Sequence, residues 1–208
     1  MLVHTFKNQP IDSNCYVIYD EHYKSCIIID PGTNGSTEII EFIDSKKLIV
    51  DYVILTHEHF DHIWGVNALV EFANPIIIAS QYCANMVKDP KKNLSLFYDQ
   101  VGFIISKEIK SIERLQESIT FGKHAVKFIY TPGHSEGSIS VNINQSLFSG
   151  DLMISGLKTI TKLPTGNKKK LLNSLELIKK KFSNKNIIVY PGHGDNFLLD
   201  DVHLNSFL

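Results

Sequence analysis

The seven-residue stretch Thr56–His62, with the sequence T-H-E-H-F-D-H, constrains this chain more than any other segment. It follows the apolar run 52–55, which predicts a buried strand, and it places three imidazoles and a carboxylate at that strand's end. Imidazole is the commonest metal ligand in proteins, and carboxylates join it readily on zinc or iron. A solvated His-rich turn often explains a single H-x-H, but it is a weak explanation of H-x-H-x-D-H. The stretch therefore predicts a metal site at the edge of a sheet.

The composition fits a globular protein and gives no reason to expect a nucleic acid or an acidic membrane as partner. Of 208 residues, 43% are hydrophobic and 21% are charged, with a formal net charge of -1. No apolar run is long enough to span a membrane, and the N-terminus lacks the pattern of a signal peptide. Three cysteines without C-x-x-C spacing favour a reducing compartment, and Cys15 and Cys26 fit buried small hydrophobes. We expect a cytoplasmic protein.

Strand-like and helix-like segments alternate in both halves of the chain, so we predict one α/β domain over residues 1–208. In the first half, the expected strands are 15–19, 26–29, 52–55 and 75–79. The expected helices are one capped by Ser36, then 64–73 and 81–87, with residues 93–97 in a loop over the site. In the second half, the expected strands are 119–122, 125–130, 138–143, 146–148 and 187–190. One further helix is expected over 168–182, with Asn167 as its N-cap and two lysine runs on its solvated face.

Three later strand ends carry the same kind of side chain as the opening stretch. They are T-P-G-H ending at His134, S-G-D ending at Asp151, and P-G-H ending at His193. A glycine precedes each of these residues and permits the tight turns that aim a side chain. The remaining histidines lack such a context, and we expect them on the surface or in the core: His4, His22, His124 and His203.

Together these motifs resemble the metallo-β-lactamase-fold hydrolases, and within them the glyoxalase II-like (hydroxyacylglutathione hydrolase-like) branch. The resemblance runs in order along the chain, as H-x-H-x-D-H, T-P-G-H-S-x-G-S, S-G-D and P-G-H-G. It implies a four-layer αββα sandwich of two similar halves, which the alternation of strands and helices fits.

Carried over position by position, the resemblance implies two divalent metal ions, with zinc expected first and iron or manganese as alternatives. The ligands of the first ion would be His57, His59 and His134. Those of the second would be Asp61, His62 and His193, and Asp151 would bridge the two. Asp30 and Thr56 would hold imidazole N–H groups from outside, although both also fit ordinary turn and strand-end chemistry.

The implied reaction is hydrolysis of a small-molecule thioester or ester, first of all an S-acyl-glutathione. A metal ion lowers the pKa of its bound water from about 15.7 to about 7, so a hydroxide between the ions would attack the carbonyl. Asp61 would orient this nucleophile and could shuttle a proton, and Asp151 would hold the ions around it. The oligomeric state stays open.

Three features separate this chain from its better-known relatives. Asp151 stands where antibiotic-hydrolysing lactamases carry a cysteine, which argues against that activity. The chain ends 15 residues after His193, so we expect a short form without the C-terminal helical segment that helps glyoxalase II enzymes bind glutathione. Many short relatives carry Gly-Arg soon after the Gly-Asp motif, but residues 155–162 contain no arginine. Lys158 or Lys162 could bind a substrate carboxylate instead, and a solvated lysine is the alternative for each.

Other functions use overlapping ligands. A mononuclear iron dioxygenase acting on persulfides needs two histidines and a carboxylate, which His57, His134 and Asp151 could supply. A lactonase needs the same hydroxide and only a different pocket. Outside enzymes, the alternative is a metal-binding regulatory module without turnover. A nuclease is known on this fold, but the near-neutral charge and the lack of an added nucleic-acid domain argue against it.

Overall fold

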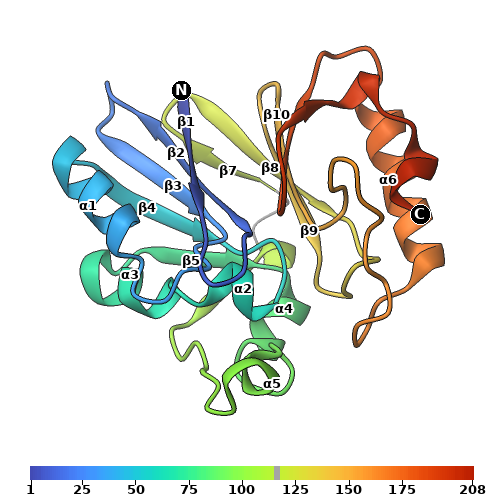
Figure 1. The fold of residues 1–208 in the computed structure, drawn as a ribbon. Coiled ribbons are helices and arrows are strands. Elements are labelled where there is room, and N and C mark those ends of the chain that lie inside the picture. Colours follow the sequence, from blue (N-terminus) through green and yellow to red (C-terminus); the bar gives the residue numbers. More distant parts are fainter. Residues whose placement is uncertain (115–117) are drawn as a thin grey trace.

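The computed structural model describes residues 1–114 and 118–208. Two six-stranded sheets lie face to face, and helices cover the outer face of each (Figure 1). This arrangement confirms the predicted four-layer αββα sandwich. Within the described residues, none of the helices combines the length and the apolar character needed to cross a membrane.

The first sheet has the order β1-β2-β3-β4-β5-β6. Its strands are β1 (Leu2–Lys7), β2 (Asn14–Asp20), β3 (Ser25–Ile29), β4 (Ile49–Ile54), β5 (Ile76–Ala79) and β6 (Ile109–Ser111). The strands β1 to β3 pair antiparallel, and β3 to β6 pair parallel. Ile29 pairs with Ile54, so β3 and β4 end side by side at one edge. The segments that follow them, with Asp30 and Thr56, therefore leave the sheet together.

The second sheet has the order β12-β11-β10-β9-β8-β7. Its strands are β7 (Ser118–Phe121), β8 (His124–Tyr130), β9 (Ile139–Ile143), β10 (Ser146–Gly150), β11 (Ile188–Pro191) and β12 (Phe197–Leu198). β10 and β11 form its one parallel pair among the described residues, and Gly150 is in register with Pro191. Because these two strands end together, the residues that follow them, Asp151 and His193, reach the same place.

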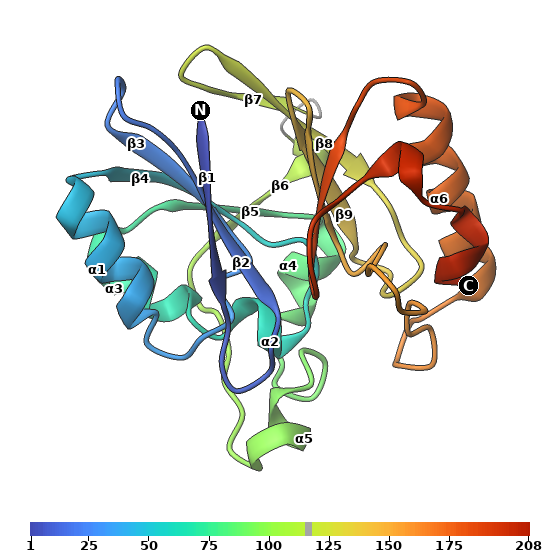
Figure 2. The same cartoon turned by 45° about the horizontal axis from the view of Figure 1, so that its top comes forward.

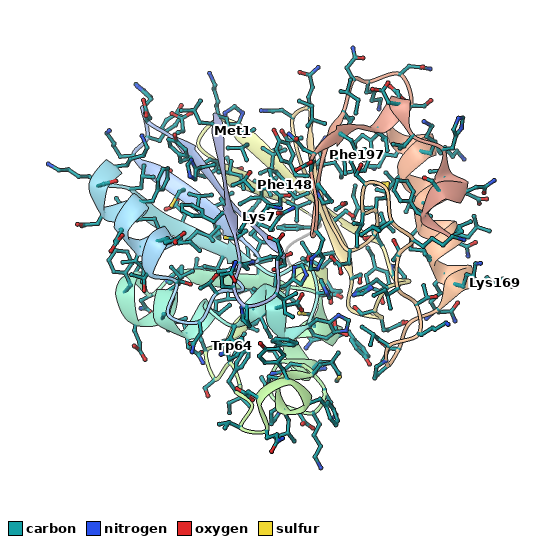
Figure 3. All side chains as sticks on the ribbon, in the orientation of Figure 1. Met1, Lys7, Trp64, Phe148, Lys169 and Phe197 are labelled. Carbon is teal, nitrogen blue, oxygen red and sulfur yellow. The ribbon has the colours of Figure 1, made fainter. Side chains whose placement is uncertain are left out.

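Helices connect the strands and cover the sheets. They are α1 (Thr37–Lys46), α2 (Phe60–Ile63), α3 (Val66–Ala73), α4 (Gln81–Met86), α5 (Ser95–Asp99) and α6 (Lys168–Phe182), with short 3-10 turns at Ile112–Arg114, Leu199–Asp201 and Leu204–Phe207. Figure 2 shows α1 and α3 outside the first sheet and α6 outside the second. The Asn167 side chain caps α6 by accepting from the Lys170 N–H at 3.0 Å, as predicted. Lys169 points away from the fold (Figure 3), as expected of a solvated helix face.

The layers follow from strict alternation along the strands. In β2, Val17 packs with the core under α1 and α3, whereas the next residue, Ile18, packs between the two sheets. In β10, Leu147 packs under α6 while Phe148 packs between the sheets. Every one of these side chains is 0% exposed, so both sheets are buried on both faces. Cys15 and Cys26 are buried free thiols, as predicted.

Several local predictions differ from the structure. Ser36 stands at the N-cap of α1 but makes no cap bond, because its φ is 47° and its hydroxyl donates to the Gly65 carbonyl at 3.2 Å. The helix predicted over 64–73 is confirmed as α3 but begins two residues later, at Val66, since the Gly65 N–H bonds to the Pro31 carbonyl instead of joining a helical turn, and the separate one-turn helix α2 precedes it. The loop predicted over 93–97 overlaps the short helix α5, and β1 and β12 were not predicted.

Candidate metal centre

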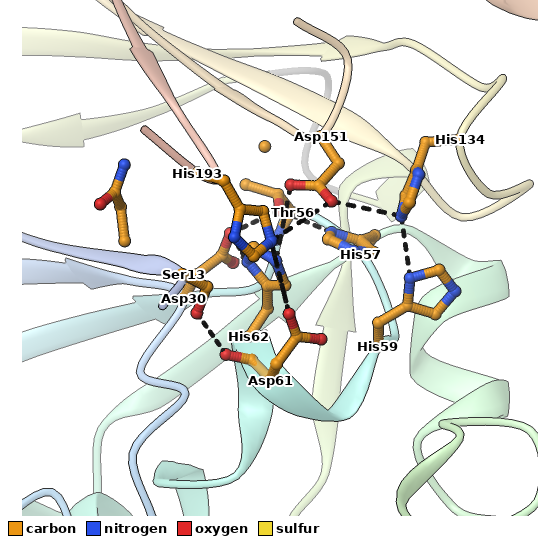
Figure 4. A network of polar contacts seen from close by, with 12 residues as sticks. Ser13, Asp30, Thr56, His57, His59, Asp61, His62, His134, Asp151 and His193 are labelled. Atoms are coloured by element: carbon orange, nitrogen blue, oxygen red, sulfur yellow. Dashed lines mark hydrogen bonds and ion pairs between the residues drawn. The ribbon is translucent and has the colours of Figure 1, made fainter. Parts of the chain in front are cut away.

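Two clusters of ligand-type side chains meet at the edge where β4, β10 and β11 end (Figure 4). We call His57, His59 and His134 cluster one, and Asp61, His62 and His193 cluster two. Within each cluster, one ligand atom per residue lies within 4.8 Å of the others. Asp61 and His62 are carried by the one-turn helix α2, while the remaining members follow strand ends. All of the sequence-predicted ligands are therefore brought together.

Cluster one consists of three buried imidazoles. His59 Nδ1 lies 2.9 Å from His134 Nε2. On its other side, His134 Nδ1 donates to the Ile160 carbonyl at 2.8 Å, which leaves Nε2 as the nitrogen with a free lone pair. His57 Nδ1 lies 3.1 Å from Thr56 Oγ1, and His57 Nε2 is buried without a hydrogen-bond partner in the structure. The lone pairs thus converge on the space between the rings.

Cluster two combines two imidazoles with a carboxylate. The Nε2 atoms of His62 and His193 lie 3.3 Å apart, and each is within 3.5 Å of Asp61 Oδ2. The outward nitrogens are held from behind: His62 Nδ1 lies 3.1 Å from Asp30 Oδ2, and His193 Nδ1 donates to the Asp12 carbonyl at 3.0 Å. Because Nδ1 donates its hydrogen outward in both rings, Nε2 is the nitrogen that faces the centre.

Asp151 lies between the clusters. Its Oδ2 is 3.4 Å from His134 Nε2 and 3.6 Å from His193 Nε2, and its Oδ1 is 3.5 Å from His62 Nε2. A neighbouring glycine is required for this position, because a Cβ on Gly192 would lie 2.0 Å from Asp151 Oδ1. One carboxylate therefore reaches members of both clusters.

Asp30 and Thr56 form the layer behind the ligands. Asp30 accepts from the Thr56 N–H at 2.7 Å and from the Thr56 hydroxyl at 2.5 Å, in addition to its contact with His62. The Thr56 oxygen, having donated its hydrogen to Asp30, is left to accept from His57 Nδ1. Asp30 also forms a third possible ligand group with His57 and His62. Its oxygens are already engaged by Thr56, which favours a supporting position over direct metal binding.

The part of the chain that holds this centre matches the model of one protein family. The model of the metallo-beta-lactamase superfamily matches residues 8–193, a range that includes both clusters and Asp151. The chain belongs to the metallo-beta-lactamase superfamily.

Individual relatives agree with this assignment. The probable metallo-hydrolase MJ0888 of Methanocaldococcus jannaschii is 32% identical over 187 residues, which cover 88% of each chain. The crystal structure of the BLEG-1 B3 metallo-beta-lactamase is similar with a TM-score of 0.83 and 28% identity, covering 95% of this chain and 94% of that one. A hydroxyacylglutathione hydrolase of Psychromonas ingrahamii is 29% identical over 145 residues, which are 70% of this chain and 48% of the relative.

The residues present fit the metal use that membership in the metallo-beta-lactamase superfamily implies. His57 Nε2 and Asp151 Oδ1 are buried acceptor-type atoms without hydrogen-bond partners in the described chain. Leaving such atoms unsatisfied is costly unless a cation occupies the space they face. The donor set of imidazole nitrogens and carboxylate oxygens is one that zinc, iron and manganese all accept.

Electrostatics differ between the clusters. Burial lowers the pKa of His57 well below its usual value and, with neighbouring His134, lowers the pKa of His59 to about 3. For His62, burial alone would lower the pKa, but Asp61, Asp151 and Asp30 outweigh burial and raise it. The pKa of Asp61 is held well below its usual value because His62 and His193 outweigh its burial. In the metal-free protein, His57 and His59 of cluster one are thus neutral and cluster two is an ion pair.

Several supporting groups have no sequence signature that we recognised. The carbonyls of Asp12 and Ile160 orient two ligand histidines, and a backbone carbonyl is not encoded by its side chain. The Ser13 hydroxyl donates to the Asp61 carbonyl at 2.6 Å. Glu58, only 2% exposed, accepts from the Ser135 hydroxyl at 3.1 Å, and burial raises the pKa of its carboxyl to about 7. A charged residue inside the motif was the signal that could have singled out Glu58.

The two lysines predicted to bind substrate make no direct contact with the ligands among the interactions of the described residues. Lys158 Nζ donates to the Leu208 carbonyl at 2.8 Å, at the far end of the described chain. Lys162 is exposed. No hydrogen bond or ion pair among the described residues joins either lysine to the clusters.

Proposed function

We propose that this member of the superfamily is a di-metal hydrolase of thioesters or esters, with S-acyl-glutathione-type thioesters as the first class to test. Asp151 carries this proposal, because its Oδ2 lies 3.4 Å from a ligand of cluster one and 3.6 Å from a ligand of cluster two. A carboxylate between the two clusters could serve as a ligand that two metal ions share. The partial likeness to a hydroxyacylglutathione hydrolase supports the choice of thioester.

Cluster one would hold one ion, cluster two the other, and Asp151 both. Zinc is our first expectation, and the same nitrogen and oxygen ligands accept iron or manganese. Bound there, the ions would supply a water of lowered pKa and neutralise the negative charge that develops on the carbonyl oxygen.

The chain's own residues would position the reactants. The Asp61 side chain is 14% exposed, so it can accept a hydrogen bond from the attacking water and take up its proton. Asp151 is 8% exposed, and it would hold cluster one and cluster two in a fixed position relative to each other. Asp30 and Thr56 would fix the rings of His62 and His57 from behind. Lys162 remains the candidate to meet a substrate carboxylate, since Lys158 is engaged by Leu208.

Three other activities compete for the same residues. His57, His134 and Asp151 could hold a single iron for persulfide oxidation, as a site of two histidines and one carboxylate allows. The likeness to BLEG-1 favours testing β-lactam hydrolysis as well, although Asp151 argued against it. A lactone is a third ester-like substrate for the same centre.

One experiment separates these possibilities. Protein loaded separately with zinc and with iron is assayed against S-acyl-glutathiones, lactones, a β-lactam and glutathione persulfide, with metal content measured on the same samples. The proposal expects about two ions per chain and fastest turnover of the thioester. One tightly bound ion together with oxygen consumption on the persulfide would replace it with the dioxygenase. Loaded protein that is inactive on the whole panel would point to a binding module.

A further inference from the structure

Exposed apolar side chains are concentrated in two segments of the chain that contact the ligand residues or their neighbours. Among the described residues, 15 large hydrophobic side chains are exposed, and seven of them lie in two short segments. We call these the α5 segment (residues 93–104) and the 155–163 segment. Their exposed members are Phe97, Tyr98, Val101, Ile104, Leu157, Ile160 and Leu163. Single exposed hydrophobics are normal, but a concentration beside a site marks a surface that binds something apolar.

The α5 segment is joined directly to the ligand stretch. Phe60, which lies between His59 and Asp61, donates its N–H to the Asn93 carbonyl at 2.9 Å. Its ring stacks on the Tyr98 ring with the centroids 4.8 Å apart. Tyr98, which is 44% exposed, is therefore joined to the ligand stretch through Phe60, and its neighbour in the chain, Phe97, is 72% exposed.

The 155–163 segment is joined to the other side of cluster one. The Ile160 carbonyl accepts the bond from His134 Nδ1, while its side chain is 56% exposed. Leu157, in the same segment, is 61% exposed. Figures 1 and 2 both place α5 at the end of the molecule where α2 and α4 lie. Since His59 and His134 are 2.9 Å apart, the two apolar segments flank one pair of ligands.

The exposure of the α5 segment is built into its local structure. Asp99 Oδ1 accepts from the N–H groups of Val101 and Gly102 at 3.0 and 2.8 Å. The Asn93 side chain donates to the Phe103 carbonyl at 2.8 Å, and the Phe103 ring stacks on Trp64. These bonds satisfy the segment's own backbone and fix its turn. The apolar side chains are therefore held out toward solvent in an ordered conformation, as a preformed binding surface requires.

The polar side of the centre lies elsewhere. The side chains of His193 and Asp61 in cluster two are 23% and 14% exposed, whereas those of His59 and His134 are 5% or less. Water and a polar leaving group can approach cluster two, while the apolar segments border cluster one. The centre therefore has a polar approach and an apolar approach.

We propose that the substrate carries an apolar acyl group of about four or more carbons, which lies between the α5 segment and the 155–163 segment. This inference rests on the proposed hydrolase function and specifies its substrate. Complete burial of a methylene strengthens binding about fourfold, and a surface that stays partly open to solvent buries it only partly. We therefore expect about two- to fourfold gain for each added CH₂, in contrast to a small or hydroxylated acyl group.

The experiment measures chain-length dependence in two ways. On zinc-loaded protein, kcat/KM is determined for acetyl-, butyryl-, hexanoyl- and octanoyl-glutathione and for lactoyl-glutathione. Independently, calorimetry gives the Kd of butyrate, hexanoate and octanoate, which needs no turnover. The expected result is a rise with chain length in both series, with lactoyl below butyryl.

Matched variants assign the effect to these segments. Phe97→Ser and Leu157→Ser should each reduce the octanoyl-to-acetyl ratio of kcat/KM by about fivefold. Phe72→Ser and Ile49→Ser remove hydrophobics that are 44% and 66% exposed on α3 and β4, and they should leave the ratio unchanged. All four positions are exposed, so thermal unfolding should be near that of the wild type.

Two results would overturn the inference. If thioesters are hydrolysed but kcat/KM does not depend on chain length, the proposed hydrolase function stands and the proposed apolar acyl group is wrong. An unchanged ratio in Phe97→Ser and Leu157→Ser, accompanied by a weaker self-association in sedimentation, would identify the two segments as an interface between copies of the chain. If no thioester is hydrolysed but carboxylate binding strengthens with chain length and is lost in both variants, the apolar surface stands and the hydrolase fails.

Discussion

The two ligand clusters are made of similar side chains in different electrostatic settings. Cluster one holds three buried imidazoles, and burial lowers the pKa of His57 and His59. In cluster two, carboxylates outweigh burial and raise the pKa of His62. Without metal, cluster one therefore presents free lone pairs, whereas cluster two carries protons that an incoming ion must displace. Buried imidazoles can therefore form a site with free lone pairs or, where carboxylates lie beside them, a site that releases protons when metal binds.

Their supports come from different parts of the chain. In cluster one, the outward nitrogens contact Thr56 and the Ile160 carbonyl. In cluster two, they contact Asp30 and the Asp12 carbonyl, which lie in the segments that follow β3 and β1. Asp151 is the group that reaches both. Substitutions should therefore divide into those that affect both clusters and those that affect one.

Loss of Asp151 should have the largest effect, because it removes the contact shared by the clusters. We expect Asp151→Ala to lower kcat/KM by more than the roughly 10- to 100-fold that loss of an outer partner costs. Metal analysis should show that more than half of the bound metal is lost. Asp151→Asn keeps the size of the side chain and serves as the matched variant. Retention of both ions and most of the activity in Asp151→Ala would remove the basis for a shared ligand.

Substitutions within one cluster should sharpen the comparison. His193→Ala should lower the affinity of cluster two for its ion and leave that of cluster one unchanged. His134→Ala should lower the affinity of cluster one and leave that of cluster two unchanged. After metal removal with a chelator, zinc binding is followed by calorimetry. Each variant should lack a different one of the two binding steps. Loss of the same step in both variants would mean that the clusters act as a single site.

Much of this centre could be predicted from the sequence because its ligands are side chains at strand ends. Residues such as His134 and Asp151 follow apolar runs and glycines, and parallel pairing then brings neighbouring strand ends together. The carbonyls of Asp12 and Ile160 could not be predicted, since any residue supplies a carbonyl. Their positions depend on loops folding back over the site.

The surroundings of the centre were less predictable for a similar reason. Leu94 and Gln100 bound α5 with φ values of 69° and 64°, and neither residue type signals a turn. Phe97 and Val101 belong to residue types that usually lie in cores, yet they are 72% and 80% exposed. Hydrophobic periodicity predicts burial, and it fails where a segment holds apolar groups out for a ligand.

Asp30→Asn should have an intermediate effect that is larger at cluster two, which Asp30 contacts directly, than at cluster one, which it reaches only through Thr56. Asparagine tolerates the φ of 54° at this position and can still accept from the Thr56 N–H. Its amide cannot accept from His62 Nδ1, so the ring loses the bond that keeps its Nε2 lone pair on the metal side. We expect about 10- to 100-fold weaker binding of the second ion by calorimetry. Asp12→Asn is the matched control, because Asp12 contributes its carbonyl and its side chain is 74% exposed. An equal loss at both ions would contradict the division.

The smallest effect should appear in the pH dependence of unfolding after metal removal. Free His takes up a proton near pH 6.5. In the folded chain the pKa of His59 is lowered to about 3. The stability that this neutral imidazole contributes is therefore full above pH 6.5 and is lost as the pH falls toward 3. The pKa of His62 is raised, so its contribution is full below pH 6.5 and declines as the pH rises. The slope from each group is at most about 1.4 kcal/mol per pH unit.

Urea unfolding in a chelator, measured from pH 5 to pH 9, separates the two contributions. His59→Gln should flatten the acid side of the stability profile, and His62→Gln should flatten the alkaline side. The signs are opposite because the unfolded chain binds more protons than folded His59, and fewer than folded His62. Should both variants flatten the same side, the clusters would share one electrostatic setting. Opposite sides would establish that the neutral and the ion-paired cluster are distinct properties of the chain, present before any ion binds.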